Sequence, residues 1–145
     1  MGDSPELTQS LTMLASVPMF SGLTKAQLRY VVQSAKERSY RAGEAIVRQG
    51  EKGIGFYLVV EGTAQVERGG KPVATLGPGQ FFGEMALVEE QPRTADVRAT
   101  PGPVRCLVLS SWDFWSAVGK EPEVLRTLFK ETVRRIRANS AALSE

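Results

Sequence analysis

Residues 81–97 read FFGEMALVEEQPRTADV, and this stretch decides how the rest of the chain is interpreted. Gly83 and Glu84 follow two phenylalanines and open a short apolar run from Met85 to Val88. A turn at a glycine can direct several backbone N–H groups at one point, and a short helical turn after it adds its positive end. The pattern therefore predicts an anion pocket at Gly83.

Two side chains narrow the kind of anion. Arg93 carries a planar guanidinium that can donate to two phosphate oxygens at once. Glu84 only accepts hydrogen bonds when ionised, so beside a phosphate it needs a donor such as a sugar hydroxyl. Together with exposed amides, these groups fit a ribose phosphate better than a bare phosphate. The alternative is a simple turn with a surface ion pair, and Glu89 and Glu90 are interpreted as a solvated loop.

The chain before this stretch begins with helices and continues with strands. Ser4 is expected to cap a helix that reaches about Ala15, and Thr24 to cap a second one that reaches about Glu37. From Ser39 the apolar period changes to two. This period predicts short strands at 39–41, 45–48, 55–61, 64–68, 73–76, 95–99 and 104–109. Turns containing glycine or proline separate most of them, which favours an antiparallel sandwich or roll.

Two helices are expected after the strands. Ser111 is predicted to cap the first, which ends near Gly119 and packs on the roll through its aromatic side. The second runs from Pro122 to about Ala142. Its apolar stripe is expected to cover another part of the molecule and contains Val124, Leu125, Leu128, Phe129, Val133 and Ile136.

Residues 81–97 resemble the phosphate-binding cassette of cyclic nucleotide-binding domains, with its F-G-E segment, small apolar run and P-R-x-A. The string PMFSGLTKAQL at 18–28 is similar to the entry segment of that family, where Phe20 and Leu23 would pack on the roll. The glycines at 43, 50, 55 and 62 match family positions that serve positive-φ turns. The resemblance covers about residues 17 to 138.

The resemblance implies an α+β fold, mainly β, in which an antiparallel β-roll (double-stranded β-helix or jelly-roll) is flanked by N-terminal helices and two C-terminal helices. It implies one domain over residues 1–145. Its parts would be an N-terminal helical segment at 1–38, the β-roll at 39–110 with the cassette at 81–97, and C-terminal lid helices at 111–142.

The resemblance also assigns roles to residues of the cassette. Glu84 would bind the ribose 2′-hydroxyl, and Arg93 would bind the cyclic phosphate with the backbone amides of Gly83, Met85 and Ala86. Thr94 would bond the phosphate or the amino group of a syn guanine. The full set of expected ligand contacts is Phe82, Gly83, Glu84, Met85, Ala86, Arg93, Thr94 and Ala95.

The C-terminal helix would close as a lid over the purine. The candidates for contact with the base are Val133, Arg134, Ile136 and Arg137. Which of them points inward is left open, since packing or a dimer seam explains any one of them equally well.

The expected ligand is a cyclic purine mononucleotide, and no other cofactor is expected. Cyclic AMP is favoured on general prevalence, and Thr94 leaves cyclic GMP open. The function implied is a regulatory sensor whose C-terminal helix moves on binding. The alternative is a nucleotide-free roll that binds a protein partner. An enzyme is disfavoured because the chain has no histidine, which removes histidine metal sites and the usual general base.

Composition predicts a soluble, globular, cytoplasmic domain, since 42% of its 145 residues are hydrophobic and 23% are charged. A net charge of +2 is too small to indicate a nucleic-acid partner, so no DNA contact is expected. The single cysteine, Cys106, is expected to be buried. No signal peptide or membrane span is expected. Expected partners are an effector domain or protein and a second copy bound through the C-terminal helix. Whether the chain is a fragment is left open.

Overall fold

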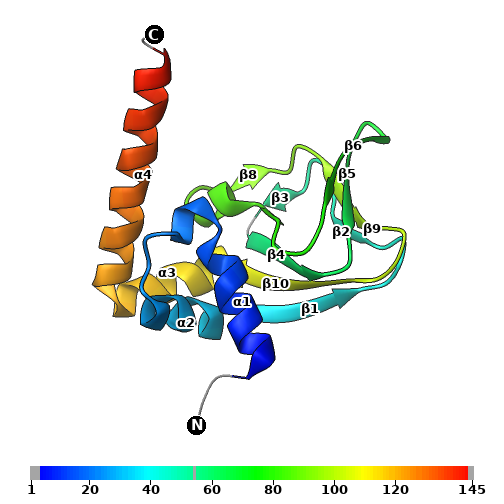
Figure 1. The fold of residues 1–145 in the computed structure, drawn as a ribbon. Coiled ribbons are helices and arrows are strands. Elements are labelled where there is room, and N and C mark those ends of the chain that lie inside the picture. Colours follow the sequence, from blue (N-terminus) through cyan, green and yellow to red (C-terminus); the bar gives the residue numbers. More distant parts are fainter. Residues whose placement is uncertain (1–3, 54, 144–145) are drawn as a thin grey trace.

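The computed structural model describes residues 4–53 and 55–143, with strands on one side and helices on the other (Figure 1). In this part of the chain the strands form two antiparallel four-stranded sheets, ordered β1-β10-β4-β7 and β2-β9-β5-β6, and a small sheet of β3 with β8. The strands are β1 (Lys36–Tyr40), β2 (Ala45–Val47), β3 (Lys52–Gly53), β4 (Gly55–Glu61), β5 (Ala64–Arg68), β6 (Lys71–Leu76), β7 (Phe81–Phe82), β8 (Gln91–Pro92), β9 (Asp96–Ala99) and β10 (Val104–Ser110). The expected α+β fold with an antiparallel β-roll is confirmed.

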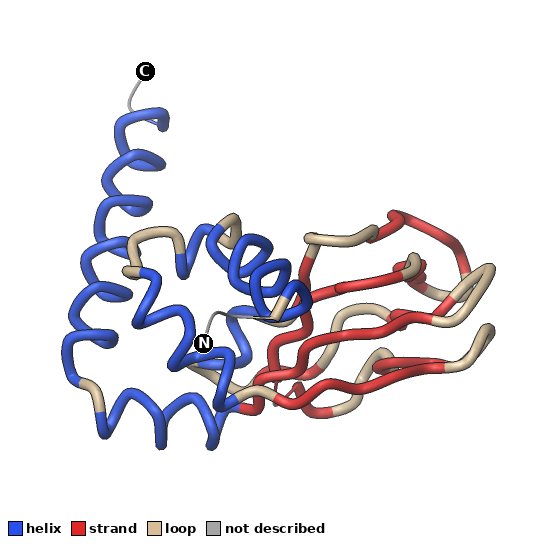
Figure 2. The backbone as a smooth tube through the Cα atoms, turned by 60° about the horizontal axis from the view of Figure 1, so that its bottom comes forward, coloured by secondary structure: helices blue, strands red, loops and turns tan. Residues whose placement is uncertain are grey.

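The helices gather at one end of the roll (Figure 2). They are α1 (Pro5–Ala15), η1 (Pro18–Phe20), α2 (Lys25–Ser34), η2 (Glu84–Leu87), α3 (Ser111–Lys120) and α4 (Pro122–Leu143). Their apolar sides share one core with the first sheet, and Phe20 lies in it with no exposed surface. A second core lies within the roll and includes Val59 and Val97. The side chains of β4 therefore serve both cores, because successive residues of a strand point to opposite faces.

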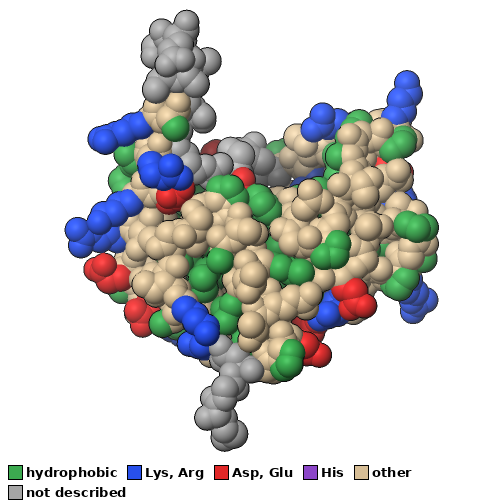
Figure 3. Space-filling view, viewed as in Figure 1, with side chains coloured by type: hydrophobic (Ala, Val, Ile, Leu, Met, Phe, Trp, Pro, Cys, Tyr) green, Lys and Arg blue, Asp and Glu red, His purple; other side chains and the backbone are tan. Residues whose placement is uncertain are grey.

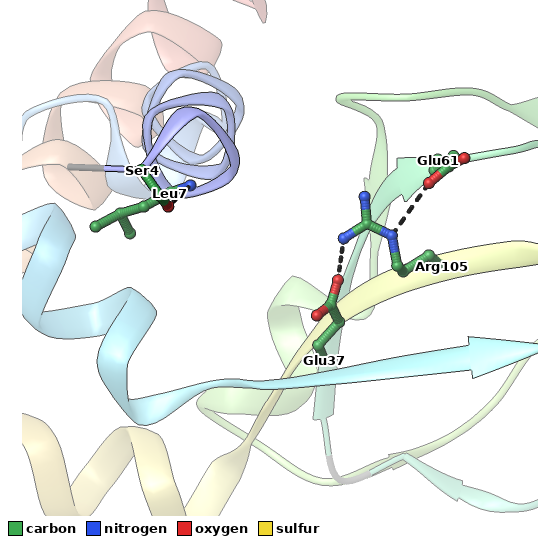
Figure 4. Close-up of polar contacts among 5 residues, drawn as sticks. All are labelled: Ser4, Leu7, Glu37, Glu61 and Arg105. Carbon is green, nitrogen blue, oxygen red and sulfur yellow. Dashed lines mark hydrogen bonds and ion pairs between the residues drawn. The ribbon is translucent and has the colours of Figure 1, made fainter.

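The first two helices begin where capping residues predict. The Ser4 hydroxyl accepts a 3.1 Å hydrogen bond from the amide of Leu7 (Figure 4). Thr24 and Gln27 form a reciprocal capping box at the start of α2. Both contacts satisfy amides that have no partner inside a helix, so the local sequence sets these two starting points.

An ion cluster joins three strands of the first sheet. Arg105 of β10 lies between Glu37 of β1 and Glu61 of β4, and its guanidinium donates to both carboxylates (Figure 4). Both pairs are largely exposed, so each contributes little to stability. The cluster marks the order β1-β10-β4 on the surface.

Several expected boundaries are wrong by a few residues. Helix α2 ends at Ser34, not near Glu37, because residues from Lys36 onward pair with β10 as strand β1. The cap of α3 is Ser110, not Ser111, since the Ser110 hydroxyl accepts from the amide of Asp113 at 3.2 Å. Strand pairing therefore starts the roll earlier than the apolar period predicts, and the cap at Ser110 ends its last strand one residue later.

The expected role of Gly55 is also wrong. Gly43, Gly50 and Gly62 have positive φ as predicted, but Gly55 lies inside β4 and does not. A Cβ atom at Gly55 would lie 3.3 Å from the carbonyl oxygen of Leu109 on the neighbouring strand. A close approach between strands therefore favours glycine at this position.

The apolar stripe of α4 is covered only in part. Val124 and Leu128 are 2% and 5% exposed, whereas Leu125, Phe129 and Ile136 are 41%, 68% and 59% exposed. The N-terminal half of α4 packs on η1 and α3, and the later half rises away from the roll (Figures 1 and 2). The rest of the described chain therefore covers only part of the stripe.

Candidate functional site

The candidate site is built from the turn that follows β7. Strand β7 pairs with β4, so that Phe82 lies opposite Tyr57 and Phe81 opposite Leu58. Gly83 then reverses the chain with a φ of +80°, and the helical turn η2 follows directly. The chain returns through β8, which pairs with β3, and reaches Arg93. The expected tight turn and short helix are both present.

Gly83 is required by its surroundings as well as by its backbone angle. A Cβ atom there would collide with the carbonyl oxygen of Gly55 and would lie 2.5 Å from Nη1 of Arg93. The clash with the Gly55 backbone is not tolerable, the Arg93 side chain would have to move away, and a positive φ adds strain for any side chain. The absence of a side chain at Gly83 lets the arginine approach the turn.

The backbone of Arg93 is fixed on both sides by the loop between β2 and β3. Its amide donates to the Glu51 carbonyl at 2.7 Å, and its own carbonyl accepts from the Gly50 amide at 2.8 Å. Its Nη2 donates to the carbonyl oxygen of Gly55 at 2.7 Å. Arg93 is thus positioned by residues about forty places earlier in the sequence.

The guanidinium of Arg93 is partly buried beside two aromatic rings. Its Cζ atom lies 5.6 Å from the ring centroid of Tyr57 and 6.0 Å from that of Phe82. Burial lowers the pKa of Arg93 from its usual value, and burial also raises the pKa of Tyr57. Both side chains are partly buried, and this burial is the main cause of both pKa shifts.

Arg93 has no carboxylate partner among the side chains that the structure describes; its hydrogen bond goes to the neutral carbonyl of Gly55. A partly buried charge costs free energy unless an opposite charge or polar groups compensate it. The arrangement therefore suits an anion that would approach Arg93 from outside.

The other residues expected to contact the ligand differ in burial. Glu84 begins η2 and is partly buried, and Ala86 is buried. The amide of Ala86 donates to the Gly83 carbonyl at 3.1 Å, so this amide is engaged within the turn itself. Thr94 is exposed, and Ala95, the residue before β9, is buried. Met85 lies in η2, and its side chain is outside the described part.

A hydrogen bond connects this turn to the C-terminal helices. Nε1 of Trp115 on α3 donates to the carbonyl of Leu87 at 2.7 Å. Leu87 itself is fully buried in the core that η2 shares with Phe114 and Val124. A shift of η2 would therefore change contacts made by α3 and by the start of α4.

The candidate lid residues lie on the part of α4 that stands away from the roll. Val133 is partly buried, while Arg134, Ile136 and Arg137 are exposed. A shallow hollow of about 350 Å³ on this helix is lined by Phe129, Lys130, Val133, Arg134 and Arg137. Figure 3 shows Lys and Arg side chains (blue) on the side of the molecule where α4 stands in Figure 1. The structure does not bring these residues together with Arg93.

The residues that the structure describes contain no group of three or more Cys, Asp or Glu side chains that could hold a metal ion. In the same part of the chain, no helix is long and apolar enough to cross a membrane. Cys106 is buried as expected, and burial raises its pKa to about 12.

Comparison with known proteins identifies the family. The sequence pattern of the family described as "Cyclic nucleotide-binding domain" matches residues 37–121, more than half of the chain. The chain belongs to this family. A cyclic nucleotide-gated potassium channel of Mesorhizobium japonicum is 37% identical over 137 residues, which are 94% of this chain and 38% of the channel. A cAMP-dependent protein kinase regulatory subunit of Mycosarcoma maydis is 35% identical over 127 residues, 82% of this chain and 24% of that protein.

Solved structures show the same cyclic nucleotide-binding fold. The N-terminal domain of a transcriptional regulator from Streptomyces coelicolor A3(2) superposes with a TM-score of 0.83 at 28% identity, covering 90% of this chain and 94% of that domain. The chain spans about a quarter to two-fifths of the length of these and similar curated relatives. The domains of this family are non-catalytic regulatory modules. In the relatives named here, the domain is part of proteins of different kinds.

Sequence reasoning missed three parts of the site. It assigned no contact to Tyr57, to the Gly55 carbonyl or to the bond between Trp115 and Leu87. The alternation of β4 predicts which face Tyr57 occupies, but only the register with β7 places it opposite Phe82. For the Trp115 contact no local pattern gives a signal, because it joins residues 28 positions apart.

Proposed function

We propose that this domain binds a cyclic purine mononucleotide through Arg93 and the turn after Gly83. The observation that carries the proposal is the partly buried Arg93 guanidinium, which has no carboxylate partner in the described part of the chain and points to the Gly83 turn. The cyclic phosphate carries one negative charge and would supply the missing anion. Hydrogen bonds to charged groups contribute roughly 1.5–3 kcal/mol each.

The remaining cassette residues complete the proposed contacts. Glu84 would accept from the ribose 2′-hydroxyl, and the amides of Gly83, Met85 and Ala86 would donate to the phosphate. Because the Ala86 amide donates to Gly83 in this conformation, its use by the ligand requires η2 to readjust. Phe82, Thr94 and Ala95 would line the pocket around these groups.

Cyclic AMP is the favoured ligand, with cyclic GMP as the second candidate. The exposed hydroxyl of Thr94 supports either choice, because it can reach toward the phosphate or toward the amino group of a syn guanine. The relatives include both a cAMP-dependent kinase subunit and a channel named only for cyclic nucleotides. The selectivity of the domain is therefore measured by comparing its affinities for cyclic AMP and cyclic GMP on one protein preparation.

We further propose that ligand binding moves the C-terminal helices. Readjustment of η2 would act on α3 through the bond from Trp115 to the Leu87 carbonyl, and on α4 through the core around Val124. The exposed part of α4 would then approach the base through Val133, Arg134, Ile136 or Arg137. Such a switch requires that the two positions of α4 differ in affinity for the ligand.

The exposed apolar residues of α4 support one further partner. Leu125, Phe129 and Ile136 are exposed in this chain and would be covered by an effector protein or by a second copy. A cytoplasmic location and the single domain over residues 1–145 remain predictions from the sequence.

Calorimetric titration tests the proposed function. The protein is unfolded and refolded to remove bound nucleotide, and is titrated with cyclic AMP and then with cyclic GMP. Saturable binding in the micromolar range or tighter is expected for one of them. Arg93→Leu should abolish it, while Arg68→Leu, the same charge change on the exposed tip of β5, should not. A folded wild-type protein that binds neither ligand would favour the nucleotide-free interaction domain.

A further inference from the structure

The pairing of β4 with β7 creates an aromatic stack next to Arg93. Tyr57 and Phe82 occupy directly opposite positions in this antiparallel pair. Their rings are parallel to within 2° and their centroids lie 4.8 Å apart. Aromatic pairs in direct cross-strand contact stabilise each other, so the stack is a rigid feature of the sheet.

The stack forms a wall along one side of the guanidinium. The Cζ atom of Arg93 lies at similar distances from the two centroids, 5.6 Å and 6.0 Å. Both distances are within the range of a cation–π contact, so the guanidinium lies against both rings. The two rings therefore restrict where the guanidinium can turn and shield it from water on that side.

Two neutral features restrict the guanidinium from other directions. The Gly55 carbonyl holds Nη2, and the backbone of Gly83 lies close to Nη1. A carboxylate in either place would also orient the arginine, but it would neutralise part of the charge that an anionic ligand needs. The aromatic stack and the carbonyl orient the group while its charge stays available.

We propose that Tyr57 and Phe82 are positioning residues that hold the Arg93 guanidinium ready for an anion in place of a carboxylate. The identity of that anion as a cyclic phosphate rests on the proposed function. The orienting effect itself is a property of the ligand-free protein, so it can be measured separately. The chain also offers a matched control, because Phe81 is the neighbour of Phe82 but packs on Phe56 in the other core.

The first experiment is NMR of the arginine guanidinium groups in the ligand-free protein, with the Arg93 signal assigned by its loss in Arg93→Lys. Tyr57→Leu and Phe82→Leu should speed rotation of the Arg93 guanidinium by about tenfold. This is the change in rate expected when one contact to a charged group is lost. Tyr57→Phe and Phe81→Leu should leave its rotation as in wild type. Unchanged rotation in both Leu variants at 57 and 82 would overturn the proposal.

The second experiment measures cyclic AMP affinity in a double-mutant cycle. Tyr57→Leu should weaken binding by about tenfold in wild type, but by less than about twofold when Arg93 is already lysine. Tyr57→Phe and Phe81→Leu should both bind with wild-type affinity. An equal loss in both backgrounds would mean that Tyr57 acts through stability or through the ligand directly, and would overturn the proposal.

The two experiments separate the possible failures. If wild-type protein binds no cyclic nucleotide, the proposed function fails and the NMR result alone decides the positioning role. Thermal unfolding of each variant confirms that it is folded at the temperature of measurement. If Phe82→Leu fails to fold, Tyr57→Leu carries the test, and the reverse holds as well.

Discussion

The turn around Gly83 and the later half of α4 were both expected to contact one ligand, yet they differ in how they are held. Arg93 is fixed by backbone bonds to the β2–β3 loop, by the Gly55 carbonyl and by two rings. In the later half of α4, Ile136 is largely exposed. Arg93 is therefore in place before a ligand arrives, whereas the Ala86 amide and the base side of the proposed site are not. Affinity is expected to depend chiefly on the first region, and the response to ligand on the second.

The largest expected effect comes from Gly83. Gly83→Val should abolish cyclic nucleotide binding and lower the free energy of unfolding by about 2–4 kcal/mol, since a Cβ atom collides with Gly55 and Arg93 and a positive φ is strained. Calorimetry and urea unfolding measure the two losses. Gly119→Ala is the control, because that glycine has no positive φ and open space around it. Normal binding by Gly83→Val would show that the turn is not the site.

The buried and exposed sides of α4 can be compared through two neighbouring residues of its first half. Leu128→Ala should lower the free energy of unfolding by about 2–4 kcal/mol, because the side chain is 5% exposed and its loss leaves a cavity. Phe129→Ala, at 68% exposure, should change it by no more than about 0.5 kcal/mol. Urea unfolding of both variants measures the contrast. Similar losses for the two would mean that the side of α4 that carries Phe129 is covered in solution.

Removing the indole donor of Trp115 should have a smaller effect on stability and a specific effect on the switch. Trp115→Phe removes the hydrogen bond to the Leu87 carbonyl, which is expected to cost about 1 kcal/mol. Cyclic AMP should still bind, but the distance change between spin labels on α4 and on β6 should shrink. Trp112→Phe, an exposed neighbour on the same helix, is the control. An unchanged response in Trp115→Phe would rule out this connection.

Alkaline pH should weaken the roll through its buried Cys106 and Tyr40 side chains. Burial raises the pKa of Cys106 from 9.0 and that of Tyr40 from 10.0, each to about 12. Because the folded pKa values are the higher ones, stability is fully present below about pH 9 and is lost as pH rises toward 12. Unfolding curves between pH 8 and 11.5 measure this loss. Tyr40→Phe should lessen the decline above pH 10, and an identical decline would contradict the assignment.

How far the sequence predicts this molecule depends on the range of the interactions involved. Caps such as Ser4 and Thr24 act within three residues, so the starts of α1 and α2 follow from local sequence. The end of α2 does not, because pairing of Lys36 with Val108 of β10 sets it. The same distinction applies at the site. Gly83 and Arg93 carry local signals, while Tyr57 joins Arg93 only through the register of β4 with β7.

Helix α4 shows a second limit of prediction from sequence. The stripe that includes Leu125 and Phe129 correctly predicts an amphipathic helix, but a stripe does not specify what covers it. In this conformation only its first part packs against η1 and α3. The position of such a helix depends on small differences in free energy between its alternative packed positions. A local sequence pattern does not predict these differences.

The most direct test of this account is a pair of crystal structures, one without ligand and one with cyclic AMP. We expect the cyclic phosphate to lie within hydrogen-bond distance of the Arg93 guanidinium, which itself moves by less than about 1 Å. We expect the later half of α4 to move so that one of Val133, Arg134, Ile136 or Arg137 contacts the base. A phosphate bound away from Arg93, or an arginine that is reoriented by the ligand while α4 stays in place, would contradict the account.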